Sequence, residues 1–183
     1  MSVPTEAKPG KLVIGLLLHH RSLLPAVAAD LNACCGPIDM ISPWFRFDFT
    51  DYYHDEMGAP LYRRLLIFRD LLPQDQLAEI KLKTNAVEAR YARDAKRNVN
   101  IDPGYLLYER LVLATGKNFT HRIYIGKRIY ADLTLIYQKG DFQTLPWTYP
   151  DYADQQMRSF LLGVRRKYAS DLKALIHYRS TQL

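Results

Sequence analysis

Cysteine is scarce in this sequence of 183 residues, where Cys34 and Cys35 stand side by side and no other cysteine occurs. Neighbouring cysteines rarely form a disulfide with each other, because the small ring that closes is strained. The pair therefore offers neither a disulfide framework nor the two C-x-x-C pairs of a zinc site. We interpret both as buried thiols rather than a redox pair, and we expect a reducing, cytoplasmic environment.

Long apolar runs are also missing. The longest candidate, residues 12–18, is much shorter than the roughly 20 residues that a membrane-spanning helix needs. The first residues, MSVPTEAKPGK, lack the apolar core of a secretory signal peptide. We therefore expect a soluble protein that is neither embedded in a membrane nor exported by that route.

The common motifs of catalysis and nucleotide binding are absent as well. A Walker A loop ending at Gly116-Lys117 would need a glycine in place of Leu111 and a serine or threonine in place of Asn118. The sequence contains no N-K-x-D guanine motif, H-E-x-x-H, C-x-x-C, G-x-S-x-G or EF-hand spacing. It therefore predicts no metal site and names no cofactor, and any nucleotide site must be of another kind.

What the sequence does contain is the composition of a globular domain. Hydrophobic residues make up 48% and charged residues 24%, and the net charge is +6. The length predicts a single domain over residues 1–183, in which residues 1–10, with two prolines and a glycine, form a loose arm. The moderately basic charge permits an anionic partner without requiring one.

Hydrophobic periodicity predicts alternating strands and helices. Residues 11–18 are nearly all apolar, which is typical of a strand buried on both faces. Further strands are expected over residues 38–47, 61–72 and 109–115, and helices over 22–35 and 73–96, with a turn at Asp102-Pro103-Gly104. The order strand–helix–strand–strand–helix–strand indicates an α+β fold with a ferredoxin-like βαββαβ core. A different α+β arrangement is the alternative.

A β-hairpin and a C-terminal amphipathic helix extend this core. Two alternating runs flank Gly126-Lys127-Arg128, and a three-residue loop there pairs Ile125 with Ile129 and Arg122 with Asp132. This register collects apolar side chains on one face, among them Ile123, Ile129, Leu133 and Leu135. Residues 154–177 keep helical apolar spacing and form the terminal helix.

Five segments together resemble a known family: FTDYYHDEMG (49–58), IKLKTNAVEAR (80–90), NVNIDPGYL (98–106), LVLATGKNFTHRIYIGKRIYADLTL (111–135) and WTYPDY (147–152). In this order they resemble the bacterial domain-of-unknown-function family 4416. The resemblance implies kinship but no activity, although some members carry a loose GTP-binding label. Arg128 stands where the family is expected to have a glycine, so it must adopt a left-handed backbone or change the turn type.

Polar residues border the apolar face of the second helix. Lys81, Asn85 and Glu88 lie within about 60° of one another at helical spacing, beside the buried position of Thr84. A polar pocket next to the core would use such a set. An ordinary i,i+4 network on a half-exposed stripe accounts for the same residues.

The start of the hairpin is the second polar segment. Arg122 opposite Asp132 is either a cross-strand ion pair or a clamp for a phosphate or carboxylate, with Lys117 as a second cation. His121 is expected on the opposite face from Arg122, among isoleucines, as a core-edge histidine rather than a general base.

Two acidic residues lie in segments that we expect to be loops. Asp102 begins the Asp-Pro-Gly turn, which by itself explains it, and Glu56 belongs to the long connection 48–60. A metal site would need both, together with Asp51. We predict that the polar segments converge on one ligand-binding pocket, formed by Glu56, Lys81, Asn85, Glu88, Asp102, Lys117, His121, Arg122 and Asp132.

Two smaller clusters complete the set of candidates. His19, His20 and Arg21 stand where a strand passes into a helix, a place that attracts anions. Trp147 and Tyr149, with Tyr152, either stack on a base or fasten the terminal helix to the sheet.

These patterns favour a binding protein or enzyme for an anionic small molecule that is phosphorylated or carboxylated, nucleotides included. The first alternative is an RNA- or DNA-binding module, which the fold, thirteen tyrosines and the basic charge allow, although no RNP-like word such as K-G-F-G-F-V occurs. The second is an interaction protein without chemistry. The residues fit catalysis and simple binding equally, and they assign no oligomeric state.

Overall fold

The computed structural model describes residues 1–49, 54–93 and 96–181 and shows an α+β fold built on one large antiparallel sheet. The nine strands follow the order β2-β4-β1-β5-β6-β8-β7, with β3 also paired to β4 and β9 to β8. The strands are β1 (Gly10–Leu18), β2 (Ile38–Ile41), β3 (Phe45–Phe47), β4 (Leu61–Leu72), β5 (Val99–Leu106), β6 (Arg110–Thr115), β7 (Arg122–Tyr124), β8 (Tyr130–Gln138) and β9 (Asp141–Thr144).

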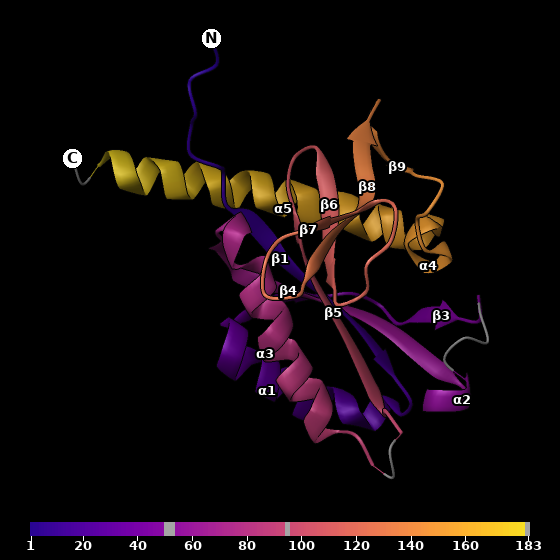
Figure 1. Cartoon of the computed structure of the whole chain (residues 1–183). Helices are drawn as coiled ribbons and strands as arrows, with labels where there is room; N and C mark the ends of the chain where they lie inside the picture. Colours follow the sequence, from indigo (N-terminus) through magenta and orange to yellow (C-terminus); the bar gives the residue numbers. More distant parts are fainter. Residues whose placement is uncertain (50–53, 94–95, 182–183) are drawn as a thin grey trace.

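Helices cover both faces of the sheet (Figure 1). They are α1 (Leu24–Cys35), α2 (His54–Met57), α3 (Leu77–Arg90), α4 (Pro150–Ala153) and α5 (Gln155–Ser180), with short 3-10 turns η1 (Arg21–Leu23) and η2 (Gln74–Gln76) before α1 and α3. One core lies between the sheet and the helices α1 and α3, and the other lies under α5. No helix among the described residues is long and apolar enough to cross a bilayer.

Strand β1 is the central strand, as its apolar sequence predicted. Every residue from Gly10 to Leu18 is buried, and β4 and β5 pair with its two edges. Successive side chains alternate between the cores, so Ile14 packs with α1 and α3 while Val13 packs with α5. Its one charged residue, Lys11, is fully buried and donates to Asp171 Oδ2 on α5 at 2.5 Å.

Two predicted elements are shorter than expected. Residues 38–47 form two strands on β4 instead of one, because the chain leaves the ladder at Pro43, which has no N–H, and the Ser42 hydroxyl accepts a hydrogen bond from Leu65 N at 2.9 Å. The second helix ends at Arg90 rather than residue 96. Residues 92–98 include no large apolar side chain to bury, so nothing holds a further helical turn against the core.

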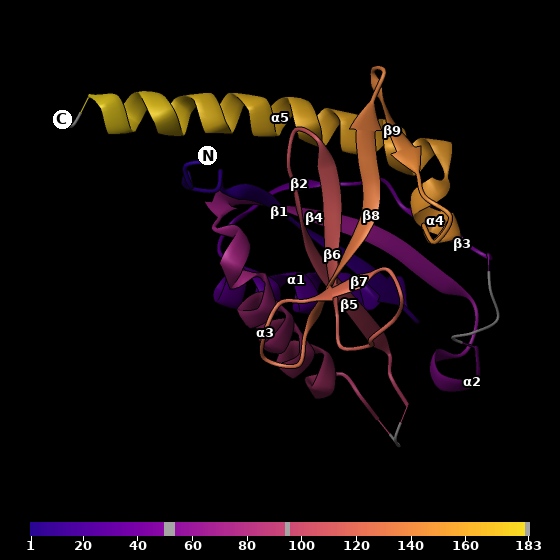
Figure 2. The same ribbon diagram turned by 45° about the horizontal axis from the view of Figure 1, so that its top comes forward.

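The predicted Asp-Pro-Gly turn is wrong, because Asp102, Pro103 and Gly104 lie inside strand β5, opposite β1. The glycine is required by packing: a Cβ at position 104 would lie 2.2 Å from the carbonyl oxygen of Val112 on β6. Strands β5 and β6 pair only at this end, from Gly104 to Leu106. The first half of β5 therefore has no β6 neighbour, and Figure 2 shows β6 and β8 upright while β1, β4 and β5 run obliquely.

The hairpin has the predicted register but not the predicted faces. Arg122 pairs with Asp132, and Arg128 takes the left-handed conformation, with φ of 63°. Ile123, expected in the core, is 71% exposed, whereas Asp132 and Thr134 are buried. The cause is a bulge: Leu111 and Val112 of β6 pair with Leu135 and Leu133, which leaves Thr134 as an extra residue and reverses the faces of β8 on either side of it.

The terminal helix α5 confirms its predicted core face over most of its length. Met157, Leu161, Val164, Tyr168 and Leu172 are buried against the sheet. Ile176, which continues the same face, is 58% exposed, because the last turns of α5 extend beyond the sheet (Figure 1).

Candidate functional site

Side chains of α3 cover the open edge of β5. Lys81 Nζ donates to the carbonyl oxygen of Ile101 at 2.8 Å, and Glu88 Oε2 accepts from the Ile101 N–H at 2.8 Å. These backbone groups would bond a neighbouring strand if β6 continued alongside, so the helix supplies the missing partners. Lys81 Nζ also lies 3.7 Å from Asp102 Oδ1. Lys81, Glu88 and Asp102, three residues of the predicted pocket, therefore meet at this edge of β5.

Arg97 joins this group to Glu56 on α2. Its Nε and Nη2 donate to the two Glu56 oxygens at 2.5 and 2.6 Å, and its Nη1 donates to Glu88 at 3.1 Å and Asn100 at 2.8 Å. The hydrogen bonds from Arg97 hold the pKa of Glu56 below its usual value, although burial opposes them. The positive charge of Lys117 lowers the same pKa by a smaller amount.

Arg63 of β4 is a buried member of the site that the sequence analysis missed. Its Nη2 lies 2.6 Å from Asp151 Oδ2 on α4, and its Nη1 lies 3.6 Å from Asp102 Oδ2. The side chains of Arg63 and Asp151 are only 5% and 4% exposed. A signal was present, because an arginine in a strand with two buried faces requires an acidic partner.

A second group forms around Asp132 of the hairpin. Its Oδ2 accepts from Arg122 Nε at 2.9 Å and lies 3.1 Å from His121 Nε2. Arg122 also donates to the Tyr149 hydroxyl at 2.7 Å and to the carbonyl oxygen of Lys117 at 3.0 Å. The expectation that His121 and Arg122 face apart is therefore wrong. His121 precedes β7 and lies in a turn, where strand alternation does not apply.

The Tyr149 hydroxyl belongs to this second group through its hydrogen bond from Arg122. Burial raises the pKa of the hydroxyl, Arg122 lowers it, and the negative charges of Asp132 and Asp102 raise it. We name the combined set the charge-balanced network; its members are Glu56, Arg63, Lys81, Glu88, Arg97, Asp102, Lys117, Arg122, Asp132 and Asp151.

Asn85 is the predicted residue that contacts none of the others. Its side chain is exposed on α3 and forms no hydrogen bond with the described part of the chain. Residues 1–49, 54–93 and 96–181 contain no group of three or more His, Cys, Asp or Glu side chains suited to hold an ion. Asp51, which the suggested metal site would need, lies outside the described residues.

The aromatic cluster packs against the network. Trp147 stacks on His121 with a centroid distance of 4.8 Å and an interplanar angle of 9°, and its Nε1 donates to the Leu133 carbonyl at 2.8 Å. Tyr152 is buried against β1, where a Cβ on Gly15 would lie 2.6 Å from its hydroxyl. These contacts fasten the segment before α5 to the sheet.

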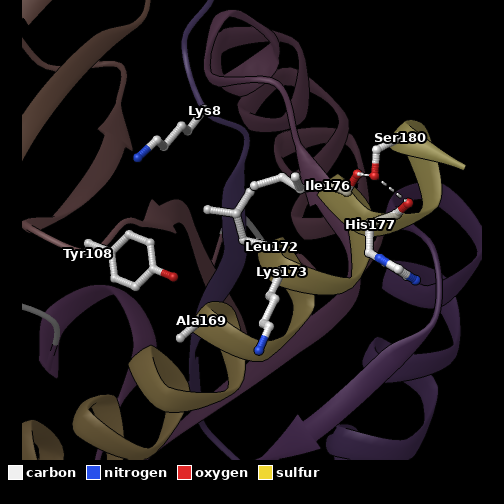
Figure 3. Close-up of a pocket in the computed structure, with 8 residues that line it drawn as sticks. All are labelled: Lys8, Tyr108, Ala169, Leu172, Lys173, Ile176, His177 and Ser180. Carbon is white, nitrogen blue, oxygen red and sulfur yellow. Dashed lines mark hydrogen bonds between the residues drawn. The ribbon is translucent and has the colours of Figure 1, made fainter. Parts of the chain in front are cut away.

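A surface groove lies at the other end of β5 and contains none of the predicted residues. Figure 3 shows Lys8 of the N-terminal arm and Tyr108 facing the last turns of α5. The groove encloses about 630 Å³ and is lined by Lys8, Tyr108, Ala169, Leu172, Lys173, Ile176, His177 and Ser180. Its lining is largely apolar with two lysines, unlike the network.

Comparison with known proteins gives one match. A family model described as Domain of unknown function (DUF4416) matches residues 8–168, which include every member of the charge-balanced network. No curated protein and no solved structure matches the chain.

Proposed function

The chain belongs to the family described as Domain of unknown function (DUF4416), and because that membership names no activity, we propose that the charge-balanced network binds an anionic small molecule. The ligand class is a phosphorylated or carboxylated metabolite, nucleotides included. We also propose that β1, α1, β2, β4, α3 and β5 form a ferredoxin-like core. The antiparallel order β2-β4-β1-β5 and the packing of α1 and α3 in one core support this assignment.

The geometry around Arg97 carries the functional proposal. Glu56 binds the guanidinium group with both oxygens, which is how arginine binds a phosphate or carboxylate ligand. Glu56 is 43% exposed, whereas Glu88, which holds Arg97 from the other side, is 14% exposed. A ligand anion that replaces Glu56 therefore finds Arg97 already oriented, and the positive charge of Lys117 also acts at this position.

Removal of Glu56 from Arg97 also changes the local charge. The network pairs its cations with carboxylates, so it attracts no anion strongly while Glu56 is bound. Once a ligand takes that position, Arg97 and Lys117 act together on it. His121 is hydrogen-bonded to Asp132. Enzymes use a histidine held by a carboxylate in this way for proton transfer, so this contact supports an enzyme rather than a simple binding protein.

Titration calorimetry with ribose 5-phosphate, GMP and citrate tests the proposal. Arg97→Gln should weaken binding about tenfold to a hundredfold, the range for loss of a charge-assisted hydrogen bond. Arg93→Gln, an exposed arginine of the same connection between α3 and β5, serves as the matched control and should bind like the wild type.

Glu56→Gln separates the proposal from a purely structural network. The amide no longer competes as an anion for Arg97, so ligand affinity should rise severalfold. Unchanged affinity in both Arg97→Gln and Glu56→Gln would exclude this site. Tighter binding of single-stranded RNA than of any small probe, lost on raising salt, would favour the nucleic-acid alternative.

A further inference from the structure

Strand β4 carries a second arginine next to Arg63, and it points to the opposite face. Arg64 lies opposite Leu16 of β1, on the side of the sheet that faces α1 and α3. Its guanidinium carbon lies 4.5 Å from the centre of the Trp44 ring. Its Nε is buried and has no hydrogen-bond partner among the described residues.

A second guanidinium group shares the same ring. Arg21, at the start of η1, lies 5.1 Å from the Trp44 ring centre and 4.4 Å from that of Tyr62. Within residues 1–49, 54–93 and 96–181, no carboxylate forms an ion pair with Arg21 or Arg64. Burial lowers the pKa of Arg64, and the positive charge of Arg21 lowers it further. Two like charges thus share one aromatic ring, and none of the described residues supplies a counter-charge.

We propose that Arg21 and Arg64 form a binding site for the phosphate group of a small molecule. The two guanidinium carbons lie 4.4–5.1 Å from aromatic ring centres, where attraction to the ring faces holds the side chains in place. Arginine carries its N–H donors at the edges of its plane, where a ligand can bind them. The planar N–H fork of arginine matches two phosphate oxygens at once, and a dianion cancels the repulsion between the two side chains. We name Arg21, Arg64, Trp44 and Tyr62 the arginine pair site.

The aromatic rings favour a phosphate over a nucleobase. Single-strand binding proteins stack bases on open aromatic faces, whereas arginine side chains already lie over Trp44 and Tyr62 here. The rings therefore position the arginines and do not form a stacking platform.

This site is independent of the charge-balanced network. Arg63 and Arg64 are adjacent in β4, so their side chains leave opposite faces of the sheet. On the network side Arg63 lies against Asp151 and Asp102, whereas on the other side Arg64 lies over Trp44. Variants of Arg97 therefore test the network, and variants of Arg64 test the arginine pair site.

The experiment measures binding of inorganic phosphate and of ribose 5-phosphate by calorimetry at constant ionic strength. Arg64→Gln and Arg21→Gln should each weaken binding of either probe about tenfold or more. Arg69→Gln is the matched control, since Arg69 lies on the same strand, is exposed and already neighbours Asp70. Both losses should persist in the Arg97→Gln background, where the charge-balanced network binds ribose 5-phosphate only weakly, so a failure of one proposal is distinguishable from a failure of the other. Tighter binding of the ester than of inorganic phosphate shows that the rest of the small molecule is also recognised.

Arg21 is exposed, so Arg21→Gln keeps the test decisive even if Arg64→Gln fails to fold. Wild-type phosphate affinity in Arg21→Gln would overturn the proposal. So would equal thermal stabilisation of the wild type by phosphate and by chloride at matched ionic strength, since screening alone would then account for it. An oligonucleotide that binds more tightly than both probes, and that Arg21→Gln releases, would overturn the small-molecule assignment in favour of nucleic acid.

Discussion

Arg63 and Arg64 are sequence neighbours on β4, yet the sheet separates them into opposite electrostatic surroundings. Arg63 lies against the carboxylates of Asp151 and Asp102, so its burial is compensated from within the chain. Arg64 shares Trp44 with another arginine and meets no described carboxylate. The comparison teaches that a buried charge with a carboxylate partner contributes to the fold, whereas two like charges that meet no described carboxylate make no such contribution.

The largest expected loss of stability comes from removing the ion-pair partner of Arg63. Asp151→Ala leaves the Arg63 charge buried without its nearest partner, and it should lower the free energy of unfolding by about 3–5 kcal/mol in urea denaturation. Asp48→Ala, which removes the partner of the exposed Arg46, should cost about 1 kcal/mol or less. Equal losses in both variants would mean that burial does not distinguish the two pairs.

The next largest loss of stability is expected from the hydrogen bond between Lys81 and the edge of β5. Lys81→Met keeps the bulk of a buried side chain but leaves the Ile101 carbonyl oxygen without its donor, which should cost about 1–3 kcal/mol. Lys83→Met, at an exposed position of the same helix, is the control and should stay within about 0.5 kcal/mol. A loss in the control as large as in Lys81→Met would contradict the role of Lys81 at this edge.

Acid should weaken the network through Glu56. Arg97 holds the folded-state pKa of Glu56 below its ordinary value of 4.5. The ionised Glu56 therefore stabilises the folded state above pH 4.5, and this stabilisation is lost as the pH falls through the folded-state pKa. Below about pH 4.5, the melting temperature of the wild type should therefore fall more steeply with decreasing pH than that of Glu56→Gln. The difference should be small because Glu56 is partly exposed, and identical pH profiles would remove Glu56 from the stabilising set.

The smallest effect on stability is expected on the face of the sheet that carries Arg21 and Arg64, which have no described carboxylate partner. Arg21→Gln removes an exposed charge that has no ion-pair partner among the described residues, so the free energy of unfolding should change by about 0.5 kcal/mol or less. Its stability should also rise less with added salt than that of the wild type, since less repulsion remains to be screened. A loss of several kcal/mol in urea would show that Arg21 holds the fold, and the contrast with Arg63 would disappear.

Much of the site could be predicted because its residues lie where local patterns place polar groups beside apolar ones. Helical spacing brought Lys81 and Glu88 to one edge of α3, and hairpin register brought Arg122 to Asp132. Arg97 could not be placed in the site from local patterns, because its partners Glu56, Glu88 and Asn100 come from three separate segments. Asn85 shares the spacing of Lys81 but points to solvent, since the edge of β5 does not reach it.

The sequence by itself determined the features that depend on neighbours along the chain. An unbroken apolar run makes β1 a strand buried on both faces, and Gly126 with two left-handed residues closes the hairpin at the predicted loop. Only the tertiary structure decided that Asp-Pro-Gly lies within a strand, that the bulge at Thr134 turns Ile123 to solvent, and that Arg63 rather than Arg64 receives carboxylates. Each of these depends on which distant segment packs alongside, and periodicity carries no information about that choice.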